Sequence, residues 1–132
     1  MNMKEIIEKY VAVWNSNGIS SLEDIFSKKS RYSDSTQEGG AIGLLTGSIA
    51  ATHKAFPNIL FQIISLSASS ENQFFLEWQM TGINTGEFLG YPPTGKRIEM
   101  QGLDSIKLES NKIAEIKSFY DSGLFSQQLE LQ

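Results

Sequence analysis

The chain has 132 residues, 40% hydrophobic and 20% charged, which indicates one globular domain over residues 1–132 and excludes a disordered chain or two ordinary domains. The 15 acidic and 11 basic residues give a net charge of −4 with no basic stripe, so we expect no nucleic-acid partner. There is no cysteine that could form a disulfide or act as a thiol nucleophile. The sequence shows no signal peptide and no apolar run of membrane-spanning length, so we expect a cytoplasmic protein without membrane contact.

The first half of the chain is predicted to be mainly helical. Apolar residues recur at helical spacing, and clusters of Asn, Ser and Gly interrupt them. We expect a helix over Ile6–Trp14 that ends at Asn15–Gly18. A short helix should follow the capping box Ser20–Glu23, with an apolar stripe of Leu22, Ile25 and Phe26. The next expected elements are an extended segment Arg31–Ser35, a loop Gln37–Gly40 and a helix over Ile42–Phe56.

The second half is predicted to be rich in strands. Ser110–Asn111 makes a tight hairpin between the last two strands, and the tail Ser122–Gln132 is expected to be a short helix or a clasp. Helices first and hairpin-linked strands afterwards predict an α+β domain whose antiparallel sheet is covered by helices on one face. The expected strands are Ile59–Ala68, Phe74–Asn84, Arg97–Glu109 and Lys112–Tyr120.

Asp104 is the most informative residue of the strand Arg97–Glu109. It shares an otherwise apolar face with Met100 and Ile106, and an ionised carboxylate is costly to bury there. Gly102 has no side chain on that face and would leave room for a cavity beside Asp104. Asp104 therefore lies either beside such a cavity or near a strand end that meets water.

The connection Thr85–Lys96 is long for a hairpin. It carries three glycines, two prolines and the apolar side chains of Phe88, Leu89 and Tyr91. Such a loop is either a flap that packs over a ligand or a cover for the end of its own sheet.

With its surroundings, this connection resembles the SnoaL-like polyketide cyclase or predicted ester cyclase family. The resemblance runs from Ala55–Asn58 to Gln128–Leu129, and its most specific part is the Gly-x-Pro-Pro-Thr-Gly-Lys motif from Gly90 to Lys96. It implies the cone-shaped fold of nuclear transport factor 2, in which N-terminal helices pack on a curved, mainly antiparallel sheet that encloses a pocket. It also implies a site without cofactor or metal, and frequent dimerisation, here through the polar face of the sheet.

The chain departs from this family at Asn84, where members with cyclase activity usually carry His. Because Asn cannot act as a general base near neutral pH, two functions stay open. One is an enzyme acting on an apolar, cyclic or polyketide-like carbonyl compound. The other is a non-catalytic ligand-binding or assembly module on the same fold.

A second resemblance, within the same superfamily, is to ketosteroid isomerase. It rests on Tyr10-Val11-Ala12 in the first helix, on Asp34, and on Asp104 before the last hairpin. Two carboxylates in one apolar cavity drive their pKa values apart. We expect Asp34 to be the base, with a neutral Asp104 and Tyr10 as hydrogen-bond donors to an enolate. Alternatively, Asp34 is an ordinary turn residue and Tyr10 an ordinary core residue.

The pocket is expected to be aromatic, which favours a flat, apolar small ligand. His53, the one histidine, has no second metal ligand in spacing and is read as a core or rim residue. The residues expected to line or border the pocket are Trp14, Tyr32, His53, Trp78, Met80, Asn84, Phe88 and Tyr120.

Overall fold

Helices fill most of the first half of the chain in the computed structural model, which describes residues 1–131. The first helix begins at Asn2, whose side chain accepts a hydrogen bond from the Glu5 amide at 2.8 Å, and it ends at Asn17 in the left-handed conformation. The helical elements are α1 (Met3–Ser16), the 3₁₀ turn η1 (Ile19–Ser21), α2 (Leu22–Ile25), α3 (Ala41–Ala55) and α4 (Gly123–Leu129).

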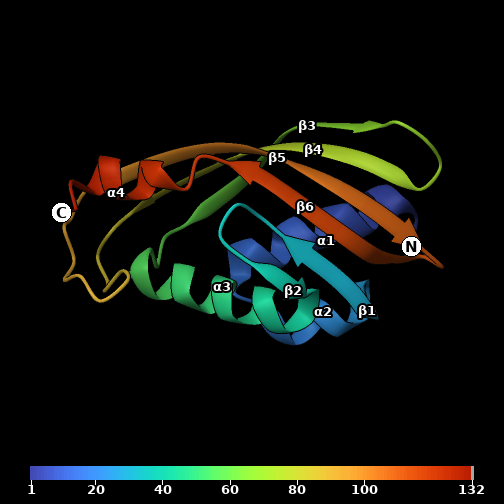
Figure 1. The fold of residues 1–132 in the computed structure, drawn as a ribbon, viewed down its shortest axis with the longest axis horizontal. Coiled ribbons are helices and arrows are strands. Elements are labelled where there is room, and N and C mark those ends of the chain that lie inside the picture. Colours follow the sequence, from blue (N-terminus) through green and yellow to red (C-terminus); the bar gives the residue numbers. More distant parts are fainter. Residues whose placement is uncertain (132) are drawn as a thin grey trace.

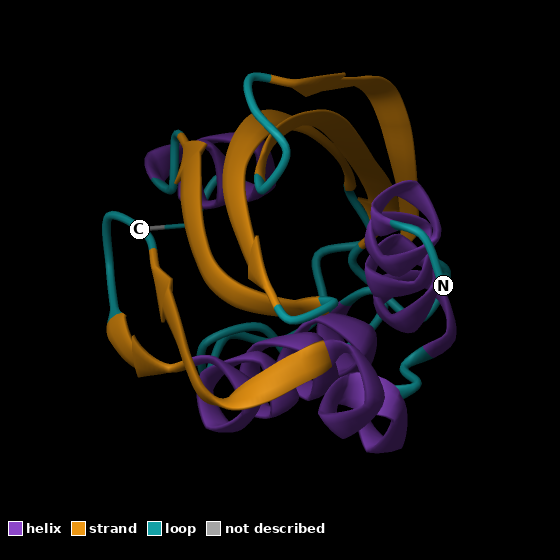
Figure 2. Ribbon diagram, turned by 90° about the vertical axis from the view of Figure 1, so that its right-hand side faces the viewer, coloured by secondary structure: helices purple, strands orange, loops and turns teal. Residues whose placement is uncertain are grey.

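One curved sheet forms the rest of the fold (Figure 1). Its six strands lie in the order β2-β1-β6-β5-β4-β3, and the sheet curls around the helices on its concave side (Figure 2). β1 pairs in parallel with β6, and the other neighbours are antiparallel. The strands are β1 (Phe26–Ser33), β2 (Glu38–Gly40), β3 (Leu60–Ala68), β4 (Gln73–Ile83), β5 (Arg97–Glu109) and β6 (Lys112–Tyr120).

The predicted α+β class and the four later strands are confirmed, with β5 and β6 at the predicted bounds. Ser110 and Asn111 form the predicted hairpin, both with positive φ. Burial alternates along β4 and β5 as predicted, so Trp78, Met80 and Asp104 lie on the concave face. This alternation places the site residues of the second half.

Three predictions for the first half are wrong in detail, and one strand pairing was not predicted. The segment Glu38–Gly40 is a strand rather than a loop, because it pairs with β1. The extended segment begins at Phe26, which is a strand residue and not part of the helix before it. No side-chain bond caps α2, so the capping box is not formed. The parallel β1–β6 pair was not expected, because its strands are too far apart in sequence for a local pattern to reveal it.

The hydrophobic core lies between the concave face of the sheet and the helices. α1 contributes Ile6, Ile7 and Tyr10, and α3 contributes Leu45 and Ile49, all at most 1% exposed. Within residues 1–131, no helix has the length and apolar character needed to cross a membrane. The concave face is not fully filled, and the remaining space forms the candidate site.

Candidate active site

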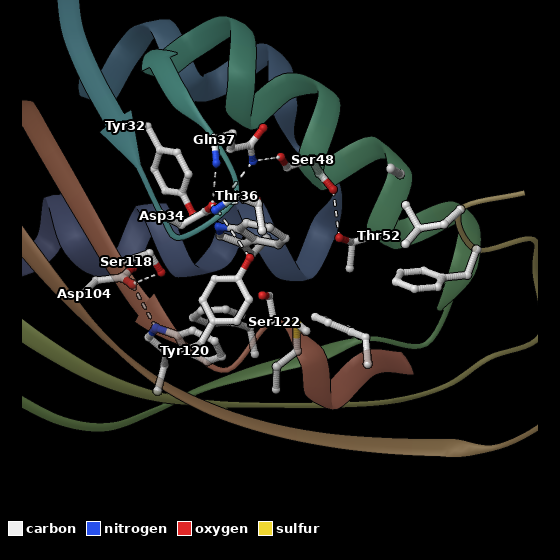
Figure 3. A pocket seen from close by; sticks show the side chains of 18 of the residues that line it. Tyr32, Asp34, Thr36, Gln37, Ser48, Thr52, Asp104, Ser118, Tyr120 and Ser122 are labelled. Carbon is white, nitrogen blue, oxygen red and sulfur yellow. Dashed lines mark hydrogen bonds between the residues drawn. The ribbon is translucent and has the colours of Figure 1, made fainter. Parts of the chain in front are cut away.

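A cavity of about 430 Å³ lies between the concave sheet, α1 and α3, near α4. It brings together residues from distant parts of the chain, including Tyr10 of α1. Figure 3 shows Asp34 at the end of β1, together with Asp104 of β5 and Tyr120 of β6. Of the residues expected from the sequence, those that line it are Tyr10, Trp14, Tyr32, Asp34, Trp78, Met80, Phe88, Asp104 and Tyr120.

Asp104 lies on the buried wall of the cavity and is 2% exposed. Its Oδ1 accepts hydrogen bonds from the Trp78 indole at 2.9 Å and from the Ser118 hydroxyl at 2.6 Å (Figure 3). Its Oδ2 has no hydrogen-bond partner among residues 1–131. Asp104 therefore presents one anchored and one unpaired carboxylate oxygen.

Gly102 determines how this arrangement is built. A Cβ atom at Gly102 would lie 2.2 Å from the Trp78 ring, so the indole occupies the space that the missing side chain leaves. Gly102 and Trp78 are direct cross-strand partners, and Asp104 follows two residues later on the same face. The expected cavity beside Gly102 is thus filled by the ring that donates to Asp104.

Burial raises the pKa of Asp104 to about 6, and the nearby charge of Asp34 adds to this rise. The hydrogen bonds from Ser118 and Trp78 oppose it without cancelling it. The carboxyl group can therefore gain and lose a proton close to neutral pH.

This raised pKa predicts a pH dependence of stability. Between the unfolded value of 3.8 and the folded value of about 6, the folded state binds a proton that the unfolded state has released. The free energy of unfolding should therefore fall by about 3 kcal/mol as pH rises through this window. Urea unfolding of wild type and Asp104→Asn measures it, since the variant should lack this slope. Equal slopes in the two proteins would contradict the prediction.

Asp34 is held very differently, in a turn at the end of β1. Its Oδ1 accepts from the Thr36 amide and hydroxyl, both at 2.7 Å, and from the Gln37 amide at 3.1 Å. Burial raises the pKa of Asp34, but these bonds and the one from Tyr32 outweigh it and lower the pKa overall. Asp34 is therefore both the predicted turn residue and part of the cavity wall, and it is ionised at neutral pH.

Three tyrosine hydroxyls belong to the cavity. The Tyr32 hydroxyl donates to Asp34 Oδ2 at 3.0 Å, and the Tyr120 hydroxyl donates to the same atom at 3.4 Å. Burial raises the pKa of Tyr10 well above 10, and Asp104 raises it further. Burial and Asp34 raise the pKa of Tyr120 to about 12. Burial raises the pKa of Tyr32 as well, so all three hydroxyls keep their protons and can donate.

The sequence did not reveal a polar wall opposite the aromatic side chains. Ser48 and Thr52 lie one turn apart on α3, and the Gln37 side chain donates to the Ser48 hydroxyl at 3.1 Å (Figure 3). The spacing of Ser48 and Thr52 on one helical face was the available signal. Leu89, named from the sequence on the long connection, also lines the cavity. The other lining residues that sequence reasoning missed are Thr36, Ala51, Phe61, Ser118, Ser122, Phe125 and Ser126.

Two of the expected pocket residues, His53 and Asn84, are not among those that line the cavity. The His53 ring shares a hydrogen bond with the Trp14 carbonyl at 2.5 Å, which joins α3 to α1. Asn84 is fully buried and organises the long connection before β5. Its amide nitrogen donates to the carbonyls of Ala55 and Gly86, and its oxygen accepts from the Thr94 amide and hydroxyl. Asn84 thus shapes the loop without contributing to the cavity.

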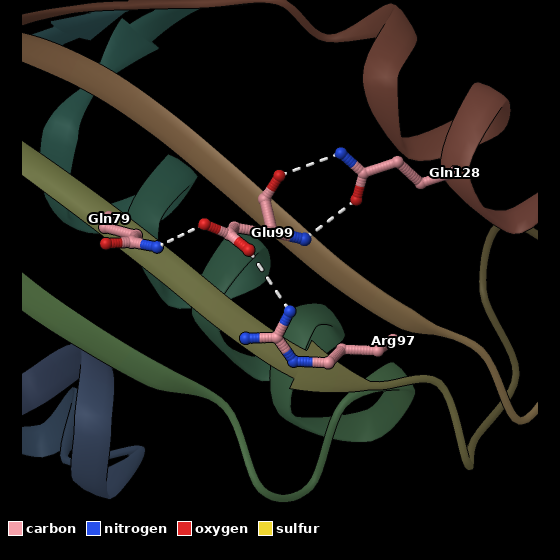
Figure 4. A network of polar contacts seen from close by, with 4 residues as sticks. All are labelled: Gln79, Arg97, Glu99 and Gln128. Atoms are coloured by element: carbon pink, nitrogen blue, oxygen red, sulfur yellow. Dashed lines mark hydrogen bonds and ion pairs between the residues drawn. The ribbon is translucent and has the colours of Figure 1, made fainter.

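Aromatic rings from the long connection and α4 meet beside the cavity. Phe88 stacks on Phe125 with centroids 5.4 Å apart, and both rings contact Phe56. Gln128 anchors α4, because its side chain accepts from the Glu99 amide and donates to the Glu99 carbonyl, both at 2.8 Å (Figure 4). β6 does not extend to Glu99, so this side chain replaces a strand partner.

Removing the Gln128 amide should therefore loosen the α4 wall. We expect Gln128→Ala to lower the free energy of unfolding by about 1 kcal/mol and to speed hydrogen exchange at the Glu99 amide and along α4. Gln127→Ala is the matched control, because Gln127 lies exposed on the same helix. Hydrogen exchange measured by mass spectrometry or NMR checks both variants. Identical exchange in the two would show that Gln128 is not the anchor.

The profile of the SnoaL-like polyketide cyclase family matches residues 4–129. The chain belongs to this family. A search of curated proteins finds no match.

Solved structures show the same fold at low sequence identity. AclR from Streptomyces galilaeus superposes with a TM-score of 0.85 at 22% identity, covering 98% of this chain and 81% of AclR. IdmH from Streptomyces antibioticus superposes with a TM-score of 0.82 at 19% identity, covering 97% of this chain and 98% of IdmH. A protein with the ketosteroid isomerase-like fold from Catenulispora acidiphila, solved in complex with trimethylamine, superposes with a TM-score of 0.80 at 15% identity. The match covers 100% of this chain and 96% of that protein. The nuclear transport factor 2-like fold of this SnoaL-like chain is thereby established.

Proposed function

We propose that this SnoaL-like protein is a cofactor-free enzyme that removes a proton next to a carbonyl group of an apolar cyclic or polyketide-like compound. Isomerisation and aldol-type ring closure both begin with this step. The family and its fold support a small-molecule cyclase or isomerase. The observation that carries the chemistry is Asp104, a buried carboxylate with one unpaired oxygen on the cavity wall.

The surroundings of the two carboxylates favour a division of roles opposite to the one expected from the sequence. Asp34 accepts hydrogen bonds on both oxygens and has a lowered pKa, which makes it a weak base. Asp104 has an available oxygen and a pKa of about 6, which suits a general base near neutral pH. In this proposal Asp104 Oδ2 takes the proton, and the hydroxyl of Tyr10 stabilises the enolate oxygen.

The test is proton exchange at carbon, which does not require the natural substrate. β-Tetralone, a flat bicyclic ketone, is incubated with the protein in deuterated buffer, and the loss of its α-proton signals is followed by NMR. We expect exchange faster than in buffer alone. Binding of the ketone without any acceleration would argue against catalysis and for the ligand-binding module.

The outer face of the sheet supports a second copy of this chain as partner. Leu103 and Phe119 are direct cross-strand neighbours on that face and are 40% and 58% exposed. Acidic Glu77 lies opposite Leu103 and basic Lys117 opposite Ser105, on either side of β5, so a twofold copy could pair opposite charges around the apolar centre. We expect a dimer for the wild type and a monomer for Phe119→Lys by light scattering coupled to gel filtration. A monomeric wild type would refute this partner.

A further inference from the structure

The cavity carries negative charge without a positive partner. Within residues 1–131 its lining includes two acids, Asp34 and Asp104, and no Lys, Arg or His. Every ion pair of these residues lies elsewhere, between exposed side chains. Neither acid therefore has a cationic partner among the described residues, and Asp104, which is 2% exposed, leaves its Oδ2 without a hydrogen-bond donor.

Aromatic rings form a continuous row along the same cavity. Trp14 stacks on Phe61 with centroids 5.6 Å apart, and Phe61 stacks on Trp78 at 4.9 Å. Tyr120 extends the row, with its centroid 5.9 Å from that of Trp78. All four side chains line the cavity. The negative face of an aromatic ring attracts a cation, and it does so most strongly where water is excluded.

These two features favour the same class of ligand. An anionic ligand would meet two carboxylates and no cation, at a Coulombic cost that grows as water is displaced. A neutral ligand would leave both carboxylates without a counter-charge. A cation would supply one and also gain contact with the rings.

We propose that the substrate's apolar framework carries one positively charged nitrogen, a protonated or quaternary amine, seated against Asp34 and the aromatic row. This inference rests on the proposed function and deepens it. Asp34 becomes the counter-charge for the ammonium group, and Asp104 remains free to take the proton from carbon. Asp34 suits this role because it stays ionised and is only half-buried, so the ammonium group keeps part of its hydration.

Three probes of similar shape and different charge test the proposal. They are para-hydroxyphenyl-trimethylammonium, para-tert-butylphenol and para-hydroxybenzenesulfonate, which share a ring and hydroxyl and carry a tetrahedral group of charge positive, zero and negative. Dissociation constants are measured by NMR titration on the full chain at about pH 7, where all three phenols are neutral. We expect the cation to bind about tenfold more tightly than its neutral isostere, and the sulfonate to bind weakest.

Two further comparisons show which carboxylates the cationic probe recognises. Asp34→Asn should bring the cation's affinity down to that of the neutral probe and leave the neutral probe unaffected. At about pH 5, where Asp104 is protonated, the cation should lose affinity and the neutral probe should not. The other titratable groups around Asp104 are Tyr10, Tyr32, Asp34 and Tyr120; the tyrosines stay uncharged in this range, and Asp34 stays ionised.

Equal or tighter binding of the neutral probe, no binding of any probe, or an unchanged preference in Asp34→Asn would each overturn the proposal. The proposed function is judged separately by α-proton exchange. If β-tetralone exchanges but the cation is not preferred, the cationic substrate is refuted and the proposed catalysis stands. If the cation is preferred but no exchange occurs, the amine-binding site stands and the proposed catalysis is refuted.

Discussion

Asp104→Asn should lower the rate of α-proton exchange in β-tetralone by about 10²–10⁴-fold, the usual contribution of a positioned general base. The amide oxygen can still accept from Trp78 and Ser118, so the fold should be retained at neutral pH. The wild-type rate should rise as pH passes through about 6, where Asp104 ionises. NMR exchange rates measured across this range, with unfolding curves for each protein, provide the check.

Asp34→Asn is the matched control for this prediction. It makes the same chemical change in the same cavity, at a carboxylate whose oxygens are already occupied by hydrogen-bond donors. We expect a smaller loss of exchange rate than in Asp104→Asn. A larger loss of exchange rate in Asp34→Asn than in Asp104→Asn would show that Asp34 is the general base, as expected from the sequence.

Gly102→Ala should cost about 2–4 kcal/mol of folding free energy, because it overpacks the core and breaks a buried hydrogen bond. The new methyl group would lie 2.2 Å from the Trp78 ring and force the indole away from Asp104. Exchange activity should fall as well, because Asp104 loses one of its two donors and its pKa rises further. Urea unfolding and the NMR shift of the Trp78 indole proton measure the two effects.

Gly47→Ala is the control for this substitution. Gly47 lies in α3, is exposed, and has no neighbouring atom within 4 Å of a new Cβ. Alanine there should stabilise the protein by about 0.5–1 kcal/mol, since glycine is a poor helix former. Destabilisation of similar size in both variants would show that contact with Trp78 is not what makes Gly102 necessary.

Local patterns in the sequence were sufficient to place several site residues. A strand repeats every two residues, so alternation alone put Trp78, Met80 and Asp104 on the concave face. The helical repeat likewise put Tyr10 in the interior. Asn84 was misplaced, and His53, read as a core or rim residue, does not line the cavity, for a related reason: a pattern shows that a side chain points inward, but not whether it meets a cavity or another part of the backbone.

The sequence by itself determined the fold class, the four later strands and the face of β5 on which Asp104 lies. Only the tertiary structure decided that Trp78 fills the space at Gly102, that Ser118 shares Asp104 Oδ1, and that Asp34 is held by its own turn and by Tyr120 from β6. The reason is physical. Which face a residue occupies depends on its near neighbours in the chain. A carboxylate's pKa depends on donors and charges in space, and for Asp104 the donors Trp78 and Ser118 come from the two neighbouring strands, while Asp34 gains Tyr120 from β6 beside the donors of its own turn.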